Sequence, residues 1–226
     1  MAEHGRLCAV AVLCLASLAG GSRAAPPDGD GAAAEARLLA SLGGSATRQG
    51  PRLQLRAANG QVVTFDSNHP DANHEAQVED YRLTGVTPDG KFFTVYGLFY
   101  ETETTYWVSR ATGAKTEVHA EPAVSPDGRY AVTALAREAF GPEGVFIWEI
   151  AGDQLVQRAR LRHADYGLFT FKRWTGKDTA ELALYSHSFL NFCPGATGTT
   201  ATVRLMHDRR GWTLSEPASA RDVRCE

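Results

Sequence analysis

The chain has 226 residues, of which 43% are hydrophobic and 22% are charged, and its formal net charge at pH 7 is −3. This balance can build a hydrophobic core and excludes an intrinsically disordered chain. A mildly acidic chain also lacks the basic footprint of a nucleic-acid-binding protein, so we expect no nucleic-acid partner.

Residues 1–24 have the pattern of a secretory signal peptide. Arg6 precedes the almost wholly apolar run Leu7–Leu18, and Ser22-Arg23-Ala24 matches a small-x-small cleavage site. The apolar run is shorter than the roughly 20 residues of a membrane-spanning helix, and no later run approaches that length. We therefore expect an exported protein, periplasmic or extracellular, with no transmembrane segment in the mature chain.

Residues 25–50 are rich in Ala, Gly, Pro and Ser, which predicts a leader ahead of the main domain. Within this leader, Ala32–Leu42 is expected to form a short helix, because Asp30 can cap its start and Gly43-Gly44 can end it. So short a helix is marginal alone. It would dock through Leu38, Leu39 and Leu42, or else remain a mobile leader.

Residues 51–226 predict one all-β domain. The dipeptide Asn59-Gly60 separates Leu53–Leu55 from Val62–Phe65, which is a strong hairpin signal. No segment after residue 50 has a helical apolar period over three turns. Further strands are expected at Phe92–Tyr100, Thr105–Ser109, Tyr130–Leu135, Val145–Ile150, Leu155–Arg160, Leu168–Phe171, Glu181–Tyr185, Thr200–Met206 and Trp212–Leu214.

An internal repeat runs through this domain. Gly85–Phe92 matches Ala123–Tyr130, and each copy is followed by an apolar strand and then by a strand carrying a tryptophan, Trp107 or Trp148. A degenerate third copy starts at Phe171–Asp178. In such turns proline fixes φ, aspartate binds its own backbone and glycine supplies a positive φ. The predicted structural turn residues are Pro88, Asp89 and Gly90, and Pro126, Asp127 and Gly128.

A period near 40 residues with about four short strands per unit is typical of propeller blades. The phrase Val124–Tyr130 and its earlier match resemble the TolB-like and WD-repeat-like β-propeller repeats of exported bacterial proteins, over residues 81–160. The resemblance implies a propeller-type platform for protein interactions, and it transfers no catalytic residues to this chain.

The length leaves room for four or five blades. We therefore predict a small or incomplete β-propeller-like array of antiparallel hairpins, with a β-sandwich or an open meander as alternatives. In a repeat array, the strands after Asp89 and Asp127 should occupy equivalent positions in successive sheets.

Cys193 and Cys225 are the two cysteines left once the signal peptide is removed. In an oxidising compartment they are expected to form a disulfide. Closing a loop of about 33 residues would stabilise the fold by roughly 3–4 kcal/mol. A reactive thiol and a metal site are the alternatives, but neither a CxxC pair nor a Cys-His spacing supports them.

The polar stretch 66–80 contains the metal candidates His69, Asp71 and His74. Imidazole and carboxylate groups are common metal ligands, but this spacing fits no helical or finger motif, and a solvated loop is the alternative interpretation. No cofactor is expected. Ser186-His187 brings together residue types used in hydrolysis, but neighbours in a strand point to opposite faces.

Three further sets of residues concern the surface. Phe189 and Phe192 could form an apolar patch beside the disulfide or pack in the core. The aromatic residues between 81 and 107 could bind carbohydrate, although packing between sheets is the better expectation. An exposed strand face is also expected to carry positive residues that could bind an anionic partner, namely Arg158, Arg160, Arg162 and His163.

Together these patterns predict a non-catalytic binding or protein-interaction module of the bacterial envelope, whose partner would be another envelope protein. The alternative is a small periplasmic enzyme or metal-binding protein that uses loop His and Asp residues. This alternative requires at least three of its candidates to converge in space, namely His69, Asp71, His74, His119, His163 and His187.

Overall fold

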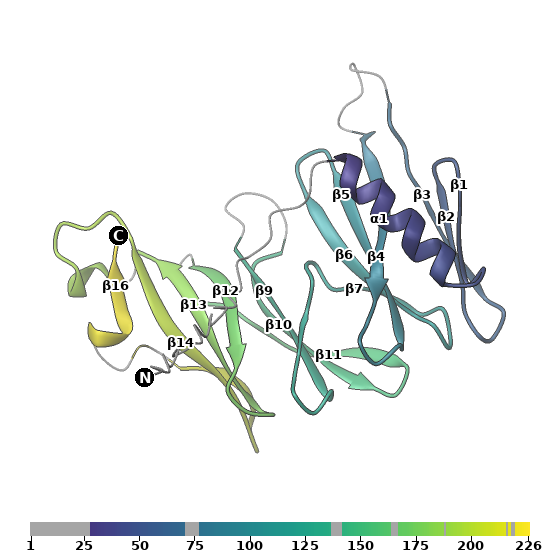
Figure 1. Ribbon diagram of the computed structural model, residues 1–226. Coiled ribbons are helices and arrows are strands. Elements are labelled where there is room, and N and C mark those ends of the chain that lie inside the picture. Colours follow the sequence, from purple (N-terminus) through teal and green to yellow (C-terminus); the bar gives the residue numbers. More distant parts are fainter. Residues whose placement is uncertain are drawn as a thin grey trace, which may run out of the picture.

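The computed structural model describes residues 28–70, 77–136, 142–163, 167–187, 189–215, 217 and 220–226. In this part of the chain the fold is all-β, as predicted. It contains four antiparallel sheets and one α-helix, α1 (Asp28–Ser41). Two single-turn helices, η2 (Leu190–Phe192) and η3 (Ala220–Asp222), lie near the C-terminus (Figure 1).

The four sheets follow one another along the chain, and within each sheet consecutive strands pair as hairpins. Sheet A contains β1 (Ala46–Gln49), β2 (Arg52–Arg56) and β3 (Val62–Asp66). Sheet B contains β4 (Glu79–Val86), β5 (Phe92–Phe99), β6 (Glu103–Ser109) and β7 (Lys115–Glu117). Sheet C contains β8 (Ala123–Val124), β9 (Tyr130–Leu135), β10 (Gly144–Ala151) and β11 (Gln154–Leu161). Sheet D contains β12 (Gly167–Trp174), β13 (Thr179–Ser186), β14 (Thr199–Asp208) and β15 (Gly211–Leu214), and β16 (Val223–Cys225) also pairs with β14.

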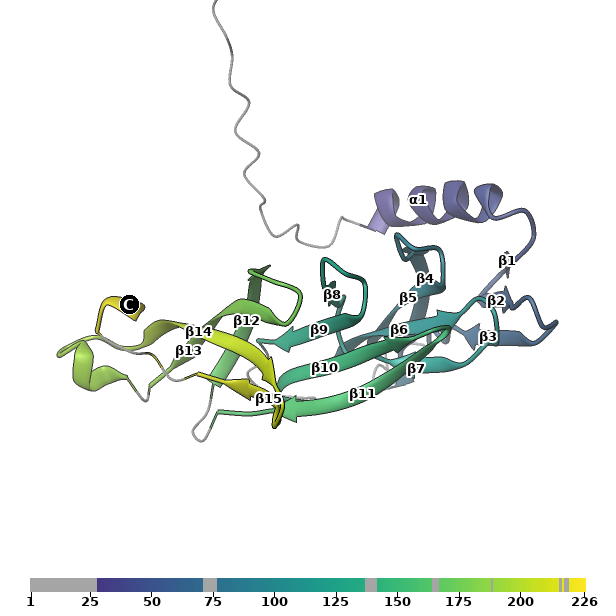
Figure 2. The ribbon, with the colours of Figure 1, turned by 90° about the horizontal axis from the view of Figure 1, so that it is seen from below.

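Three hydrophobic clusters hold the sheets together, one at each contact between successive sheets. Leu53 and Leu55 of sheet A pack with Val95 of sheet B. Sheets B and C share the next cluster, and sheets C and D share the third. Figures 1 and 2 place sheets A and D at opposite ends of the row. The described strands therefore form an open stack, and the closed ring of a propeller is not seen.

The burial pattern of each strand depends on its sheet's place in the stack. Strands β9 and β10 of sheet C are buried at almost every position, because both faces of that sheet are covered. In sheets A and D, by contrast, β2 and β13 alternate between more and less buried residues. The outward positions of sheet A are polar, as at Arg52, Gln54 and Arg56, so this end of the stack faces water.

The turn between β4 and β5 is built around Asp89. Its carboxylate accepts hydrogen bonds from Thr87 Oγ1 at 2.7 Å and from the Lys91 backbone N–H at 3.2 Å. The Phe92 N–H donates to Thr87 Oγ1 at 3.1 Å, which fixes the first residue of β5. Gly90 has a φ of +73°, a left-handed conformation that glycine adopts without strain.

The turn between β8 and β9 repeats this network. Asp127 accepts from Ser125 Oγ at 2.7 Å and from the Arg129 N–H at 3.2 Å, and the Tyr130 N–H donates to Ser125 Oγ at 2.9 Å. Gly128 has a φ of +70°. Strands β5 and β9 are both second in their sheets, so the expected equivalence of the strands after Asp89 and Asp127 is observed.

The degenerate third copy lies at the matching place in sheet D, between β12 and β13. There Asp178 O accepts a hydrogen bond from the His207 N–H at 3.0 Å. In sheet B the corresponding acceptor is Lys91 O, which accepts from the Arg110 backbone N–H at 2.8 Å. In sheet C it is Arg129 O, which accepts from the Ile150 backbone N–H at 2.8 Å. The connection to the third strand is kept although the Pro-Asp-Gly sequence is lost.

The two tryptophans of the repeat do not occupy equivalent positions. Trp107 lies opposite Thr94, the third residue of β5, whereas Trp148 lies opposite Ala131, the second residue of β9. One step of register reverses the face of a strand residue. The two indoles therefore point into the same interface, between sheets B and C, where Phe92 also stacks on Trp107 at 5.4 Å.

The N-terminal leader expected at residues 25–50 contributes to the fold. Helix α1 docks through Leu38, Leu39 and Leu42 against the cluster shared by sheets A and B, the first of the two outcomes considered for it. Residues 46–49, placed in that leader by composition, form β1 and pair with β2. Strand β4 was not expected, because its first residues, Glu79 and Asp80, are acidic.

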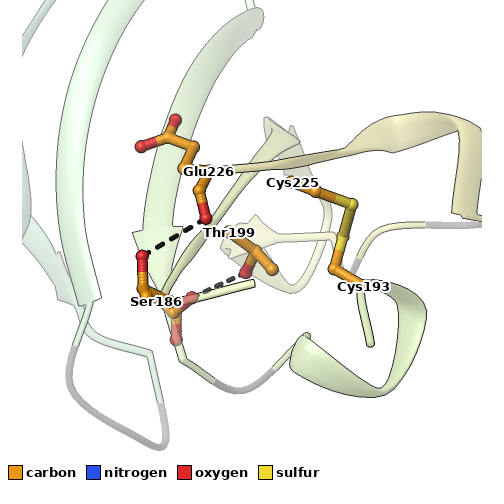
Figure 3. The surroundings of a disulfide bond; sticks show 6 residues. Ser186, Cys193, Thr199, Cys225 and Glu226 are labelled. Atoms are coloured by element: carbon orange, nitrogen blue, oxygen red, sulfur yellow. Dashed lines mark hydrogen bonds between the residues drawn. A yellow bond between two sulfur atoms is a disulfide. The ribbon is translucent and has the colours of Figure 1, made fainter. Parts of the chain in front are cut away.

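The predicted disulfide between Cys193 and Cys225 is present, with a Cα–Cα distance of 5.5 Å. It joins the residue after η2 to β16, as Figure 3 shows. Glu226 O accepts a hydrogen bond from the Thr197 N–H at 3.0 Å, and Thr199 Oγ1 donates to Ser186 O at 2.6 Å. These contacts fasten the C-terminus to sheet D.

No helix in the described ranges is both long enough and apolar enough to cross a membrane.

The turn network predicts a pH-dependent contribution to stability. Hydrogen bonds from Ser125 and Arg129 lower the pKa of Asp127 below its ordinary value of 3.8. A lowered folded-state pKa stabilises the fold at neutral pH, and this contribution is lost as the pH falls through the folded value. We expect Asp127→Asn to lower the free energy of unfolding at pH 7 by about 1 kcal/mol or less, and to have a smaller effect at pH 3.

Urea denaturation at the two pH values measures both effects, and Asp153→Asn, in the exposed turn between β10 and β11, is the matched control. An Asp127→Asn effect that is no larger than the control's, or that grows at pH 3, would contradict the assignment.

Candidate functional site

Helix α1 is fastened to the stack by one buried carboxylate. Glu35 is only 7% exposed and accepts two hydrogen bonds from Arg48, at 2.8 Å from Nε and 2.7 Å from Nη2. Arg48 Nη2 also donates to Tyr81 O at 2.6 Å, and the Leu83 backbone N–H donates to Glu35 Oε1 at 2.7 Å. One ion pair thus connects α1, β1 and β4.

These contacts bind backbone groups at the outer edge of sheet B, where β4 is the first strand. An edge strand presents backbone N–H and C=O groups that would otherwise pair with another chain. Here Glu35 accepts from Leu83, Arg48 donates to Tyr81 O, and Ser67 Oγ accepts from the Tyr81 N–H at 3.0 Å. Side chains from α1, β1 and the segment after β3 therefore bind this edge, and the backbone of Asn68 pairs with Glu79 beside them.

A groove of about 630 Å³ lies between α1 and the strands β4 and β5. Its apolar lining comes from Ala34, Leu38, Leu83 and the ring of Tyr96. Two arginines also line it, and Glu35 at the junction is already neutralised by Arg48. We call this feature the α1–β4 groove.

One exposed arginine and one paired arginine lie at the border of the α1–β4 groove. Arg37 is exposed on α1, and Arg82 on β4 makes an ion pair with Asp80 at 3.4 Å. The arrangement can hold an apolar group and attract a nearby negative charge. The polar groups that line it include Ser41 and Thr84, whose hydroxyls donate to Leu38 O and Thr94 O.

A second, more open hollow of about 670 Å³ lies near the first repeat turn. Three cations line it: Arg110 Nη1 donates to Gly90 O at 2.9 Å, Lys91 lies 3.6 Å from Asp89, and Arg56 is exposed. Because no large apolar side chain lines this hollow, the α1–β4 groove is the stronger candidate for a binding site.

Of the three proposed metal ligands, the structure describes only His69. His69 is exposed, and its Nε2 lies 3.5 Å from Asp80 Oδ1. Asp71 and His74 lie outside the described residues. Within the ranges that are described, no group of three His, Cys, Asp or Glu side chains could hold a metal ion.

The other candidate histidines lie against separate aromatic side chains. His119 packs on Phe146 at 4.6 Å, His163 on Phe189 at 5.6 Å and His187 on Tyr185 at 5.8 Å. Ser186 is fully buried whereas His187 is exposed, in agreement with the expectation that they point to opposite faces.

Phe189, Arg158 and Arg160 pack against the fold, whereas the side chain of Phe192 lies outside the described residues. Phe189 is 8% exposed and belongs to the cluster between sheets C and D, so it does not form an exposed patch. Arg158 pairs with Glu149, and Arg160 lies over the Phe146 ring at 4.9 Å. These two arginines are therefore committed to contacts within sheet C.

The α1–β4 groove was not found from sequence. Two sequence features belong to it: Glu35 in the expected helix, and strand β4. Because β4 begins with polar residues, the pattern of apolar residues does not predict it. Glu35 and Leu83 are 48 residues apart, and nothing local indicates that they meet.

No protein-family model matches the chain, and no curated protein matches it.

The buried ion pair predicts a large effect for Glu35. Removing its carboxylate leaves Arg48 without its paired negative charge and the Leu83 N–H without its acceptor, and we expect Glu35→Ala to lower the free energy of unfolding by about 3 kcal/mol. Glu35→Gln retains one acceptor and should lose less. Urea denaturation measures the loss, and amide hydrogen exchange at Leu83 should accelerate. The control is Glu101→Ala, in an exposed loop; equal effects of the two alanine variants would contradict the assignment.

Proposed function

We propose that this chain is an exported, non-catalytic binding module of the bacterial envelope, and that it holds a segment of another envelope protein in the α1–β4 groove. The observation that carries the proposal is the groove itself, a preformed apolar hollow of about 630 Å³ beside a sheet edge that is fastened by a buried ion pair. A rigid groove limits the ordering cost of binding.

The proposed partner segment is apolar and flanked by acidic residues. Ala34, Leu38 and the ring of Tyr96 offer contact to one or two apolar side chains, and Arg37 favours a carboxylate at the border. Complementary charge mainly raises the rate of encounter and fixes orientation, while the buried apolar contact supplies affinity.

The proposal includes the fold type and the location. We regard sheets B, C and D as blade-like units of the TolB-like and WD-repeat-like kind, arranged in an incomplete array. Their identical order of strands and the shared hydrogen bonds of the connecting turns support this relation. The signal-like residues 1–24 and the disulfide Cys193–Cys225 support export, because disulfides persist in oxidising compartments.

The test of binding uses variants that fill the groove while leaving the core intact. Ala34 is exposed and lines the groove, whereas Ala36 is exposed on the same helix but does not line it. With the purified protein immobilised in an envelope extract, we expect Ala34→Trp to reduce capture of the bound partner at least about tenfold, and Ala36→Trp to leave it unchanged.

A charge reversal, Arg37→Glu, should also weaken capture, and more strongly at low salt, since exposed charges are screened as ionic strength rises. Specific capture that is equal for the wild type, Ala34→Trp and Ala36→Trp would show that the groove is not the binding site. The absence of any specifically captured protein would contradict the proposed function.

A further inference from the structure

A cavity of about 300 Å³ lies at one end of the contact between sheets C and D, away from the α1–β4 groove. Six of its ten lining residues are apolar, namely Leu161, Phe169, Leu184, Val203, Trp212 and Leu214, and the other four are Arg162, His163, Thr213 and Ser215. Ligand pockets are typically of this size or larger and have mostly apolar walls.

The polar groups of this cavity are rich in hydrogen-bond donors. Arg162 lines it from the end of β11, is exposed, and makes no ion pair or hydrogen bond with the other residues described. Ser215 Oγ accepts from the Arg204 N–H at 3.0 Å, so its own proton remains to be donated. Guanidinium groups donate and never accept.

The indole of Trp212 forms part of the cavity wall. Trp212 lines the cavity and is 8% exposed, and its buried Nε1 has no acceptor within the described ranges. Trp148 Nε1 donates to Thr133 and Trp174 Nε1 donates to Ala123 O, whereas Trp107 Nε1, in the cluster between sheets B and C, also has no acceptor among the described residues. The hydrogen-bond donors that this cavity offers a ligand are therefore those of Arg162 and Ser215, and the indole of Trp212 contributes an apolar wall.

We propose that this cavity binds a small carboxylic acid anion with an apolar body. An ionised carboxylate only accepts hydrogen bonds, which matches donors such as Arg162 and Ser215. Since a water-sized group occupies about 30 Å³, the cavity has room for about ten non-hydrogen atoms. Medium-chain fatty acid anions such as octanoate have this size and chemistry.

Octanoate titrated into the full chain tests the proposal, with tryptophan fluorescence as the readout. Trp212 lines the cavity, whereas no tryptophan lines the α1–β4 groove, so the emission distinguishes the two sites. We expect a saturable change that Trp212→Phe abolishes. The neutral analogue octanol should bind at least about fivefold more weakly, because it carries no charge for Arg162.

The decisive variant is Arg162→Gln, which removes the cation from an exposed position and should leave the fold intact. We expect it to weaken octanoate binding about tenfold. Arg204→Gln is the matched control, because Arg204 is exposed on the opposite face of sheet D, and it should change affinity less than about twofold. No saturable change, a response that survives Trp212→Phe, or equal losses in the two arginine variants would each overturn the proposal.

Discussion

The structure depends on the burial of sheet faces against one another. Sheets B and C have two apolar faces each, and a four-stranded sheet of that kind cannot remain in water. Each must be covered on both sides, which requires sheets A and D. The end sheet A turns polar residues such as Arg52 and Arg56 outward, and so the stack can terminate without closing into a ring. Repeat arrays use the same device when their terminal units carry a polar outer face.

The packing of sheet faces against one another determines where other molecules can bind. Because the inner faces of the sheets are occupied by packing, the two candidate sites lie at a strand edge and at the end of an interface. The α1–β4 groove lies at an edge, where Glu35 and Arg48 bind backbone groups of β4. The cavity lined by Trp212 lies at the end of the contact between sheets C and D. Both features arise where regular stacking stops.

Local patterns predicted much of the fold. The Asn59-Gly60 turn pairs β2 with β3, and the repeated Asp89 and Asp127 turns start equivalent strands, because each signal acts over a few residues. Strand β4 was not predicted, because its exposed edge is polar. Trp107 and Trp148 were matched by order along the chain, but their different registers bring them into one interface. The groove could not be predicted, because contacts between distant residues such as Glu35 and Leu83 create it.

The open stack is the central claim, and one distance tests it directly. Spin labels would be placed at Thr64→Cys and Thr202→Cys, on the outward faces of sheets A and D, in a chain that also carries Cys8→Ser and Cys14→Ser. Packed sheets lie about 10 Å apart, so three successive interfaces predict a separation of about 30 Å or more between the two labels. Pulsed electron–electron double resonance measures this distance. A single short distance, of about 10–15 Å, would mean that sheets A and D adjoin in a closed ring and would contradict the open stack.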